Sequence, residues 1–101
     1  MSEPTPGRCK PDTMKLLADY WVLRIVEEVN ASDSGLRFSA LQRALGGASP
    51  ATLSNRLQLL EERDILTRAE NGASVTYSLS ERGATVLPVI RAISSFAEAD
   101  S

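Results

Sequence analysis

Histidine is absent from this sequence of 101 residues, and there is a single cysteine, Cys9. Without histidine, neither a Ser-His-Asp triad nor a Cys-His pair can form, and the commonest zinc ligand is missing. One cysteine cannot form an intrachain disulfide, which excludes a disulfide-stapled secreted scaffold. There is also no glycine-rich phosphate loop and no Asp-x-Asp pair. We therefore expect no enzymatic activity, no metal site and no cofactor.

Long hydrophobic runs are missing as well. No apolar run approaches the roughly 20 residues that a membrane-spanning helix needs. The first residues, MSEPTPGRCKPD, lack the apolar segment of a secretory signal. We expect a cytoplasmic protein with a flexible arm over residues 1–10 and a single domain over residues 11–101. The hydrophobic share of 43% is enough for one compact core.

Positive charge is scarce overall but locally concentrated. The formal net charge is −2 and the isoelectric point is about 5.1, which gives no general support for nucleic-acid binding. Between Ser34 and Leu60, however, there are three arginines and no acidic residue: Arg37, Arg43 and Arg56. Because the location of charge matters more than its sum, this window predicts a locally basic surface on an acidic protein.

The first helix is predicted from the spacing of apolar residues. Asp12 is a plausible N-cap, and apolar side chains then recur every three or four residues, at Met14, Leu17, Trp21, Ile25 and Val29. The turn-forming cluster NASDSG at 30–35 ends this helical pattern.

Two short helices with a tight turn follow, over about residues 39–63. Ser39 and Gln42 match a capping box, and Gly46-Gly47 permit a sharp reversal of the chain. Ser49 is then a predicted N-cap with Pro50 at the first helical position. This order indicates a helix-turn-helix.

The pattern changes to that of a β-hairpin over about residues 65–79. Val75, Tyr77 and Leu79 alternate with polar residues, and Asn71-Gly72 is expected to supply two positive φ angles for a tight turn. A hairpin directly after a helix-turn-helix is a wing, and Ser80 caps a last helix over about residues 80–97.

The last helix has an apolar face covering about half of its circumference. A domain of this size has little spare core for so wide a face, so we expect it to be the dimer interface. The alternative is a helix packed wholly on its own domain. The predicted interface residues are Val86, Leu87, Val89, Ile90, Ile93 and Phe96.

The helix after Ser49 has a second, polar face. Leu53, Leu57 and Leu60 form its buried seam, and small polar residues lie opposite. In a DNA major groove, Asn55 could bond adenine on two atoms and Thr52 could contact a thymine methyl, while Arg56 could reach guanine or phosphate. An exposed Leu59 and Glu62 argue against DNA contact by the C-terminal half of this helix. The alternative to a DNA-binding helix is a capped surface helix with no binding role.

With these motifs in place, the chain resembles the HxlR-type winged helix-turn-helix transcriptional regulators from about Cys9 to Phe96. The most specific matches are SPATLSNRLQLLEE at 49–62 and YSLSERG at 77–83. The resemblance implies a mainly α fold with a small β-hairpin and a C-terminal dimerisation helix. It also implies a cytoplasmic homodimer that binds a pseudo-palindromic operator in double-stranded DNA, with half-sites about one helical turn apart. A repressor is expected, with a small molecule or an oxidant as its effector.

Two departures from the family, and one position that matches it, leave questions open. The residues ADY at 18–20 replace two glycines and a lysine, so the first helix is either broken near Tyr20 or continuous. Asp64 stands where a glycine usually ends the recognition helix, and a left-handed residue there would be strained. Cys9 holds the position at which some relatives sense oxidants or electrophiles. Its neighbours Arg8 and Lys10 favour the thiolate, although a lone cysteine is also often inert.

The predicted function is thus sequence-specific DNA binding by a homodimeric regulator. The alternative is a winged-helix module that binds protein and not DNA, favoured by the acidic isoelectric point and the exposed leucine. The predicted DNA-binding residues are Arg37, Ser39, Arg43, Ser49, Pro50, Ala51, Thr52, Asn55, Arg56, Arg68, Asn71 and Ser74.

Overall fold

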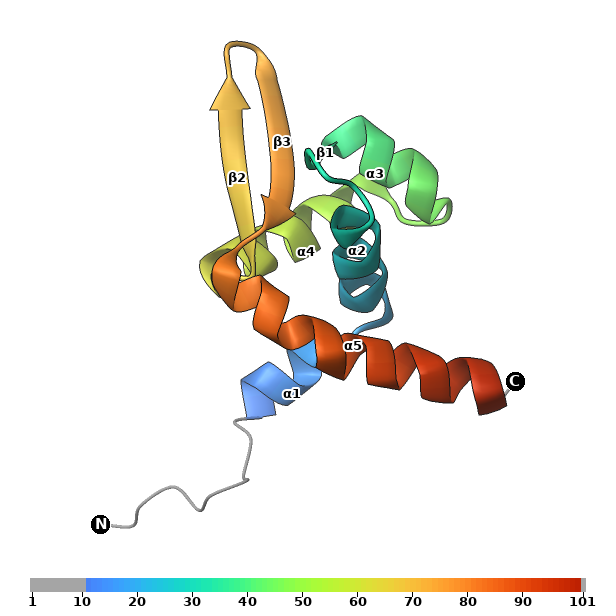
Figure 1. The fold of residues 1–101 in the computed structure, drawn as a ribbon. Helices are drawn as coiled ribbons and strands as arrows, with labels where there is room; N and C mark the ends of the chain where they lie inside the picture. The colour runs from blue at the N-terminus through green and yellow to red at the C-terminus, as the bar shows by residue number, and fades with distance from the viewer. Residues whose placement is uncertain (1–10, 101) are drawn as a thin grey trace.

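The computed structural model describes residues 11–100, as a mainly helical domain with a small antiparallel sheet (Figure 1). The expected fold class is confirmed. The elements are α1 (Pro11–Leu17), α2 (Tyr20–Asn30), β1 (Leu36–Arg37), α3 (Phe38–Leu45), α4 (Pro50–Glu62), β2 (Leu66–Asn71), β3 (Ser74–Leu79) and α5 (Glu81–Asp100).

The core forms around α2, on which α3, α4 and α5 pack. Each helix contributes apolar residues three or four positions apart, which places them on one face. A fully buried leucine or isoleucine stabilises the fold by about 1.5–3 kcal/mol. The largest side chains in this core are Val22, Ile25, Val26, Val29, Leu41, Leu53, Leu57, Leu60, Leu66 and Ile90. Met14, predicted in the inward stripe of the first helix, is instead 57% exposed.

The first helical region is broken, which settles the question left open at Tyr20. Helix α1 ends at Leu17, and Asp19 caps α2 with an extended backbone. The Asp19 carboxylate accepts a hydrogen bond of 3.0 Å from the Val22 backbone N–H. An aspartate at the N-cap therefore starts a new helix here without a glycine break.

The capping box predicted at Ser39 is wrong. Helix α3 begins at Phe38, and the N-cap position belongs to Arg37, whose side chain makes no capping hydrogen bond. Arg37 is extended because Leu36 and Arg37 form strand β1, which pairs with Tyr77 and Thr76 of β3. This strand was not predicted. It brings the chain into α3 directly from the sheet, so Ser39 lies inside the helix.

The ends of α4 follow the sequence prediction. The Ser49 hydroxyl accepts a hydrogen bond of 3.1 Å from the Thr52 N–H, and Pro50 occupies the first helical turn. At the other end Asp64 adopts φ 59°, the left-handed conformation expected there. This lets the Ile65 N–H bond the Leu60 carbonyl at 2.9 Å and turns the chain into β2.

The wing is a hairpin, as predicted, but its turn is displaced by one residue. Strands β2 and β3 pair from Leu66↔Leu79 to Asn71↔Ser74, so the connecting residues are Gly72 and Ala73. Only Gly72 of the loop has a positive φ, at 61°. A positive φ at the first loop position alone is typical of a type II′ turn, whereas the predicted Asn71-Gly72 turn needs two.

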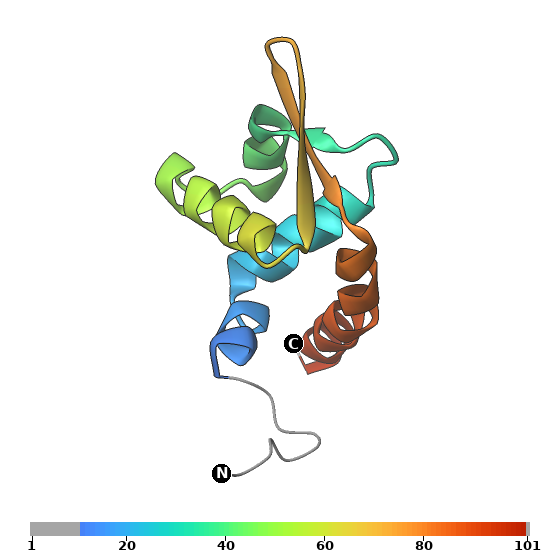
Figure 2. The same ribbon diagram turned by 90° about the vertical axis from the view of Figure 1, so that its left-hand side faces the viewer.

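Helix α5 starts at Glu81, directly after Ser80, whose hydroxyl accepts a hydrogen bond of 2.9 Å from the Gly83 N–H. The helix contains Pro88 and lies, like α1, at the end of the molecule opposite the tip of the wing (Figures 1 and 2). No helix among residues 11–100 is long and apolar enough to cross a membrane.

Candidate nucleic-acid interface

The N-terminal half of α4 presents a small, uncharged polar surface. Ala51, Ser54 and Asn55 are exposed and Thr52 is half-buried, while the first turn contains no acidic residue. The Ser49 hydroxyl donates to the Thr52 hydroxyl at 3.0 Å, which orders both side chains at the helix start. Figure 2 shows α4 projecting from the side of the domain opposite α5. Ser54 belongs to this surface and was missed, because on the helical wheel it lies nearer the flank than the centre.

Arg56, predicted to reach guanine or phosphate, is paired with an acid of its own chain. Its Nε and Nη2 atoms donate to one oxygen of Asp19 at 3.2 and 2.9 Å, and its side chain is only 29% exposed. This ion pair joins the middle of α4 to the start of α2, 37 residues away in the sequence. Arg56 also donates from Nη1 to the Asn55 side-chain oxygen at 2.9 Å. The guanidinium therefore fixes α4 on α2 and orients Asn55.

Asp19 is ionised in this arrangement. Its partial burial raises the pKa of the carboxyl, but hydrogen bonds from Arg56 and from the Val22 N–H outweigh that effect. The pKa of Asp19 consequently lies below its ordinary value of 3.8.

The predicted phosphate contacts divide into two groups. Arg37, Ser39 and Arg43 are exposed, at the start of and along α3, and neither arginine takes part in an ion pair within residues 11–100. In the wing, Arg68 instead pairs with Glu70. The hydrogen bond from Arg68 to this carboxylate raises the pKa of the guanidinium above its ordinary value. A cation already paired with a neighbouring acid attracts phosphate less strongly, so the positive surface is centred on α3.

The hairpin tip contributes polar groups rather than charge. Asn71 is exposed and Ser74 is half-buried, at the last pair of the ladder. Figures 1 and 2 place this tip and α3 at the same end of the molecule.

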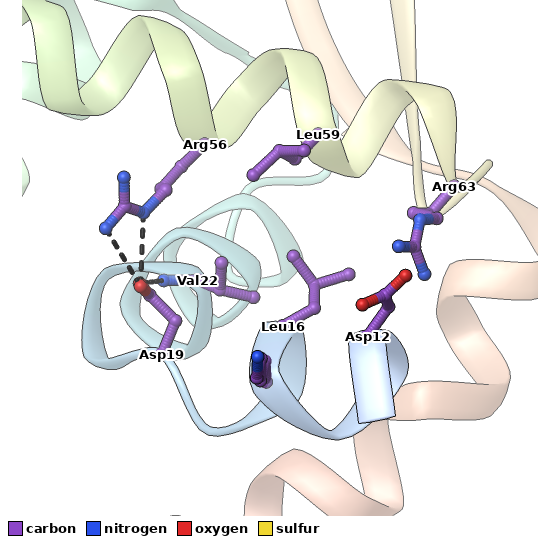
Figure 3. A pocket seen from close by; sticks show the side chains of 8 residues that line it. Asp12, Leu16, Asp19, Val22, Arg56, Leu59 and Arg63 are labelled. Atoms are coloured by element: carbon purple, nitrogen blue, oxygen red, sulfur yellow. Dashed lines mark hydrogen bonds and ion pairs between the residues drawn. The ribbon is translucent and has the colours of Figure 1, made fainter. Parts of the chain in front are cut away.

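The C-terminal half of α4 differs from the N-terminal half. Glu61 and Glu62 are exposed, and the Gln58 amide donates to Glu62 at 3.3 Å. The prediction of an exposed Leu59 is wrong: its side chain is half-buried and lines a cavity together with Leu16 and Val22 (Figure 3). Negative charge therefore restricts any DNA contact to the first turns of the helix.

The second candidate surface is on α5, and the structure corrects its predicted composition. Ile90 is fully buried in the core of its own domain, so it has no surface left for a partner. Val86 and Leu87 are partly buried against the same core. Val89, Ile93 and Phe96 remain exposed at 47%, 37% and 74%.

Two apolar side chains from outside α5 were missed by the sequence analysis. Met14 of α1 and Tyr20 of α2 are 57% and 61% exposed. Tyr20 and Ile93 line opposite walls of a groove of about 300 Å³ between α2 and α5. The apolar surface is therefore wider than one helix. The helix break at Asp19 could have indicated that Met14 and Tyr20 are exposed, because it turns α1 away from the axis of α2.

Residues 11–100 hold no group of three His, Cys, Asp or Glu side chains arranged to bind a metal ion. Cys9, the predicted redox site, lies outside the described residues.

Residues 16–100 match the family described as HxlR-like helix-turn-helix. Two uncharacterized HTH-type transcriptional regulators of Bacillus subtilis are similar in sequence. YvaP is 34% identical over 86 residues, which cover 81% of this chain and 77% of YvaP. YdzF is 31% identical over 81 residues, which cover 77% of this chain and 73% of YdzF.

Solved structures share the fold. The protein ytfH of Salmonella typhimurium superposes with a TM-score of 0.80 at 28% identity, over 88% of this chain and 80% of ytfH. The redox regulator HypR in its oxidized form, at 22% identity, has a TM-score of 0.79 over 87% of this chain and 92% of HypR. With its family model, its similar sequences and its fold in agreement, this chain belongs to the HxlR-like helix-turn-helix family of transcriptional regulators.

Proposed function

We propose that this protein is a homodimeric, sequence-specific DNA-binding regulator that acts as a repressor, with the N-terminal half of α4 in the major groove. The observation that carries the proposal is the outer face of α4. Its first turns expose Ala51, Ser54 and Asn55 behind a Ser49 cap, with no acid among them. Small uncharged side chains fit a groove that would reject bulk and negative charge, and helices of this kind dock by their N-terminal residues.

Base recognition in this proposal centres on Asn55. An asparagine side chain can accept from adenine N6 and donate to N7, which discriminates by about 1–3 kcal/mol. The bond from Arg56 to the Asn55 oxygen leaves its amide nitrogen free to donate and holds the side chain in place. Thr52 and Ser54 flank it.

Phosphate contacts come from Arg37, Ser39 and Arg43, together with the hairpin tip at Asn71 and Ser74. The Ser49-Pro50 start of α4 adds the positive end of a helix dipole. These contacts position the helix on the duplex without specifying sequence. Arg68 contributes less, since Glu70 neutralises it.

The dimer forms through the exposed apolar residues of α5, α1 and α2. Val89, Ile93 and Phe96 are exposed on α5, Ile93 shares a groove with the exposed Tyr20, and Met14 of α1 is exposed as well. Exposed apolar surface of this kind marks a protein interface. Two copies joined at this end present two α4 helices, which matches a pseudo-palindromic operator.

A salt titration against a random-sequence duplex tests the DNA proposal. A protein that neutralises phosphates releases counterions, so its affinity should fall steeply as salt rises. The Arg43→Gln variant should show a shallower salt dependence. Arg91→Gln, which removes another exposed arginine, on α5 at the other end, is the control. Absence of binding at low salt would favour the alternative, a protein-interaction module.

Sensing through Cys9 is a separate proposal that rests on the flanking Arg8 and Lys10. If the thiolate is the sensor, oxidants or quinones should release the wild type from DNA and leave Cys9→Ser bound. Equal release of both would show that the cysteine has no sensing role.

A further inference from the structure

A cavity of about 270 Å³ lies between α1, α2 and α4 (Figure 3). Its wall is apolar in the middle, where Leu16 and Val22 reach the surface of the core and Leu59 lies across from them. Figure 3 shows one arginine of the α4 side at each end of the cavity, Arg56 on one side of Leu59 and Arg63 on the other. The cavity thus combines an apolar middle with cationic ends.

The charges of the lining do not cancel. Arg56 is paired with Asp19 at one end, and at the other end Figure 3 shows the Asp12 carboxylate facing Arg63. Lys15 is a third cation in the lining, so three positive and two negative groups leave a net charge of +1. An anionic ligand is therefore favoured over a cationic one.

We propose that this cavity binds a small aromatic carboxylate. Ligand sites start at about 300 Å³, so this volume fits a single ring and little more. The ring packs on Leu16, Val22 and Leu59. The carboxylate is held by Arg63 and Lys15, because a charge-assisted hydrogen bond from arginine is the strong way to hold such a group.

The cavity is connected to the proposed DNA-reading residue. Arg56 lines the cavity, bonds Asp19 and also bonds Asn55. A ring packed against Leu59 moves α4 relative to α2, which disturbs the Arg56–Asp19 ion pair and changes how Asn55 is oriented. Occupancy therefore alters DNA affinity; this step alone rests on the proposed function.

Binding is tested with sodium benzoate, titrated into the isotope-labelled full-length chain and followed by amide chemical shifts. The proposal predicts saturable shifts around Leu16, Val22 and Leu59, and much weaker shifts with benzylamine, which carries the opposite charge. Shifts that do not saturate, or that are equal for the two probes, would overturn it.

Variants locate the site. Arg63→Gln should weaken benzoate binding about tenfold or more, the effect of losing one charge-assisted bond. Arg91→Gln, on exposed α5, should bind benzoate like the wild type. Leu59→Trp should fill the cavity and abolish binding while the far-ultraviolet circular dichroism stays unchanged. Wild-type affinity in both Arg63→Gln and Leu59→Trp would refute the site.

The coupling to DNA is measured separately. Saturating benzoate should change duplex affinity, and the duplex should change benzoate affinity by the same factor, because linkage is reciprocal. If benzoate binds and duplex affinity does not change, the site stands and the coupling is refuted. If benzoate binds and no duplex binds at all, the proposed function fails while the site stands.

Discussion

Helices α4 and α5 both pack one side on α2, yet their outer faces differ in chemistry. Helix α4 buries Leu53, Leu57 and Leu60 and exposes small polar groups. Helix α5 is longer but fully buries only Gly83 and Ile90, and it leaves Ile93 and Phe96 exposed. The buried residues explain the fold. The outer faces fit the two proposed partners, which are the DNA major groove for α4 and a second copy of the chain for α5.

The largest expected effect is the loss of α5 packing in Gly83→Ala. A Cβ atom at Gly83 would lie 2.2 Å from the Ile65 carbonyl oxygen, which also accepts the Ser80 N–H at 3.0 Å. Because backbone must move to relieve this contact, we expect a loss of about 5 kcal/mol in the free energy of unfolding, at the upper end for a single substitution, measured with urea. In the control Gly47→Ala, the new Cβ meets only Trp21 at 3.6 Å. Equal stability of the two variants would contradict the packing described here.

Next in size is the contrast between two apolar residues of α5. Ile90→Ala should lower the free energy of unfolding by about 2–5 kcal/mol, since it opens a void in the core. Phe96→Ala should leave the folded protomer within about 0.5 kcal/mol of the wild type. It should nevertheless weaken the dimer by about 2 kcal/mol, measured by sedimentation equilibrium. An unchanged dimer constant in Phe96→Ala would remove α5 from the interface.

On α4, Asn55→Ala should reduce affinity for a duplex selected from random sequences by about 1–3 kcal/mol. Affinity for an unselected duplex should hardly change, because that binding depends on phosphates. Gln58→Ala is the matched control, since the Gln58 amide is bonded to Glu62. Fluorescence anisotropy measures the dissociation constants of both variants for both duplexes. The account is wrong about Asn55 if both variants lose the same affinity.

Asp19→Asn tests the connection that holds α4 in place. The pKa of Asp19 is lowered in the folded protein, so its contribution to stability is present above pH 3.8 and lost as the pH falls through the folded-state pKa. Asparagine still caps α2 but removes the charge. We expect a loss of about 1 kcal/mol at neutral pH that vanishes in acid, followed by urea unfolding across pH. A loss of the same size at every pH would exclude the ion pair as its cause.

The smallest effect is expected at the end of α4. Asp64 has φ 59°, a conformation that glycine adopts without a Cβ clash. Asp64→Gly should therefore raise the free energy of unfolding by about 0.5 kcal/mol, and Asp64→Ala should lower it. Thermal unfolding compares them, and a stabilised alanine variant would contradict the left-handed assignment.

Features set by neighbours in the sequence were predictable. The Ser49 cap with Pro50, the Gly46 turn, the Asp64 conformation and the Ser80 cap each depend on hydrogen bonds within a few residues. The wing was predicted from the alternation of apolar and polar residues and from a glycine in the turn. Such signals depend on local backbone chemistry, which the residue types themselves determine.

Features set by distant partners were not predictable. Strand β1 exists because Tyr77 and Thr76 pair with it. Because of this pairing, α3 begins at Phe38, before the capping box that was predicted at Ser39. Arg56 was predicted to contact DNA because the sequence does not show that Asp19, 37 residues earlier in the chain, lies beside it. Similarly, helical spacing alone could not separate buried Ile90 from exposed Ile93, because the difference depends on where α2 lies.

Hydroxyl-radical footprinting of the wild type on a selected duplex tests both helices at once. If α4 enters the groove and α5 joins two copies, protection should appear in two successive major grooves about 10 base pairs apart. The Phe96→Asp variant should lose both protected regions together. One protected groove, or none at low salt, would contradict the account.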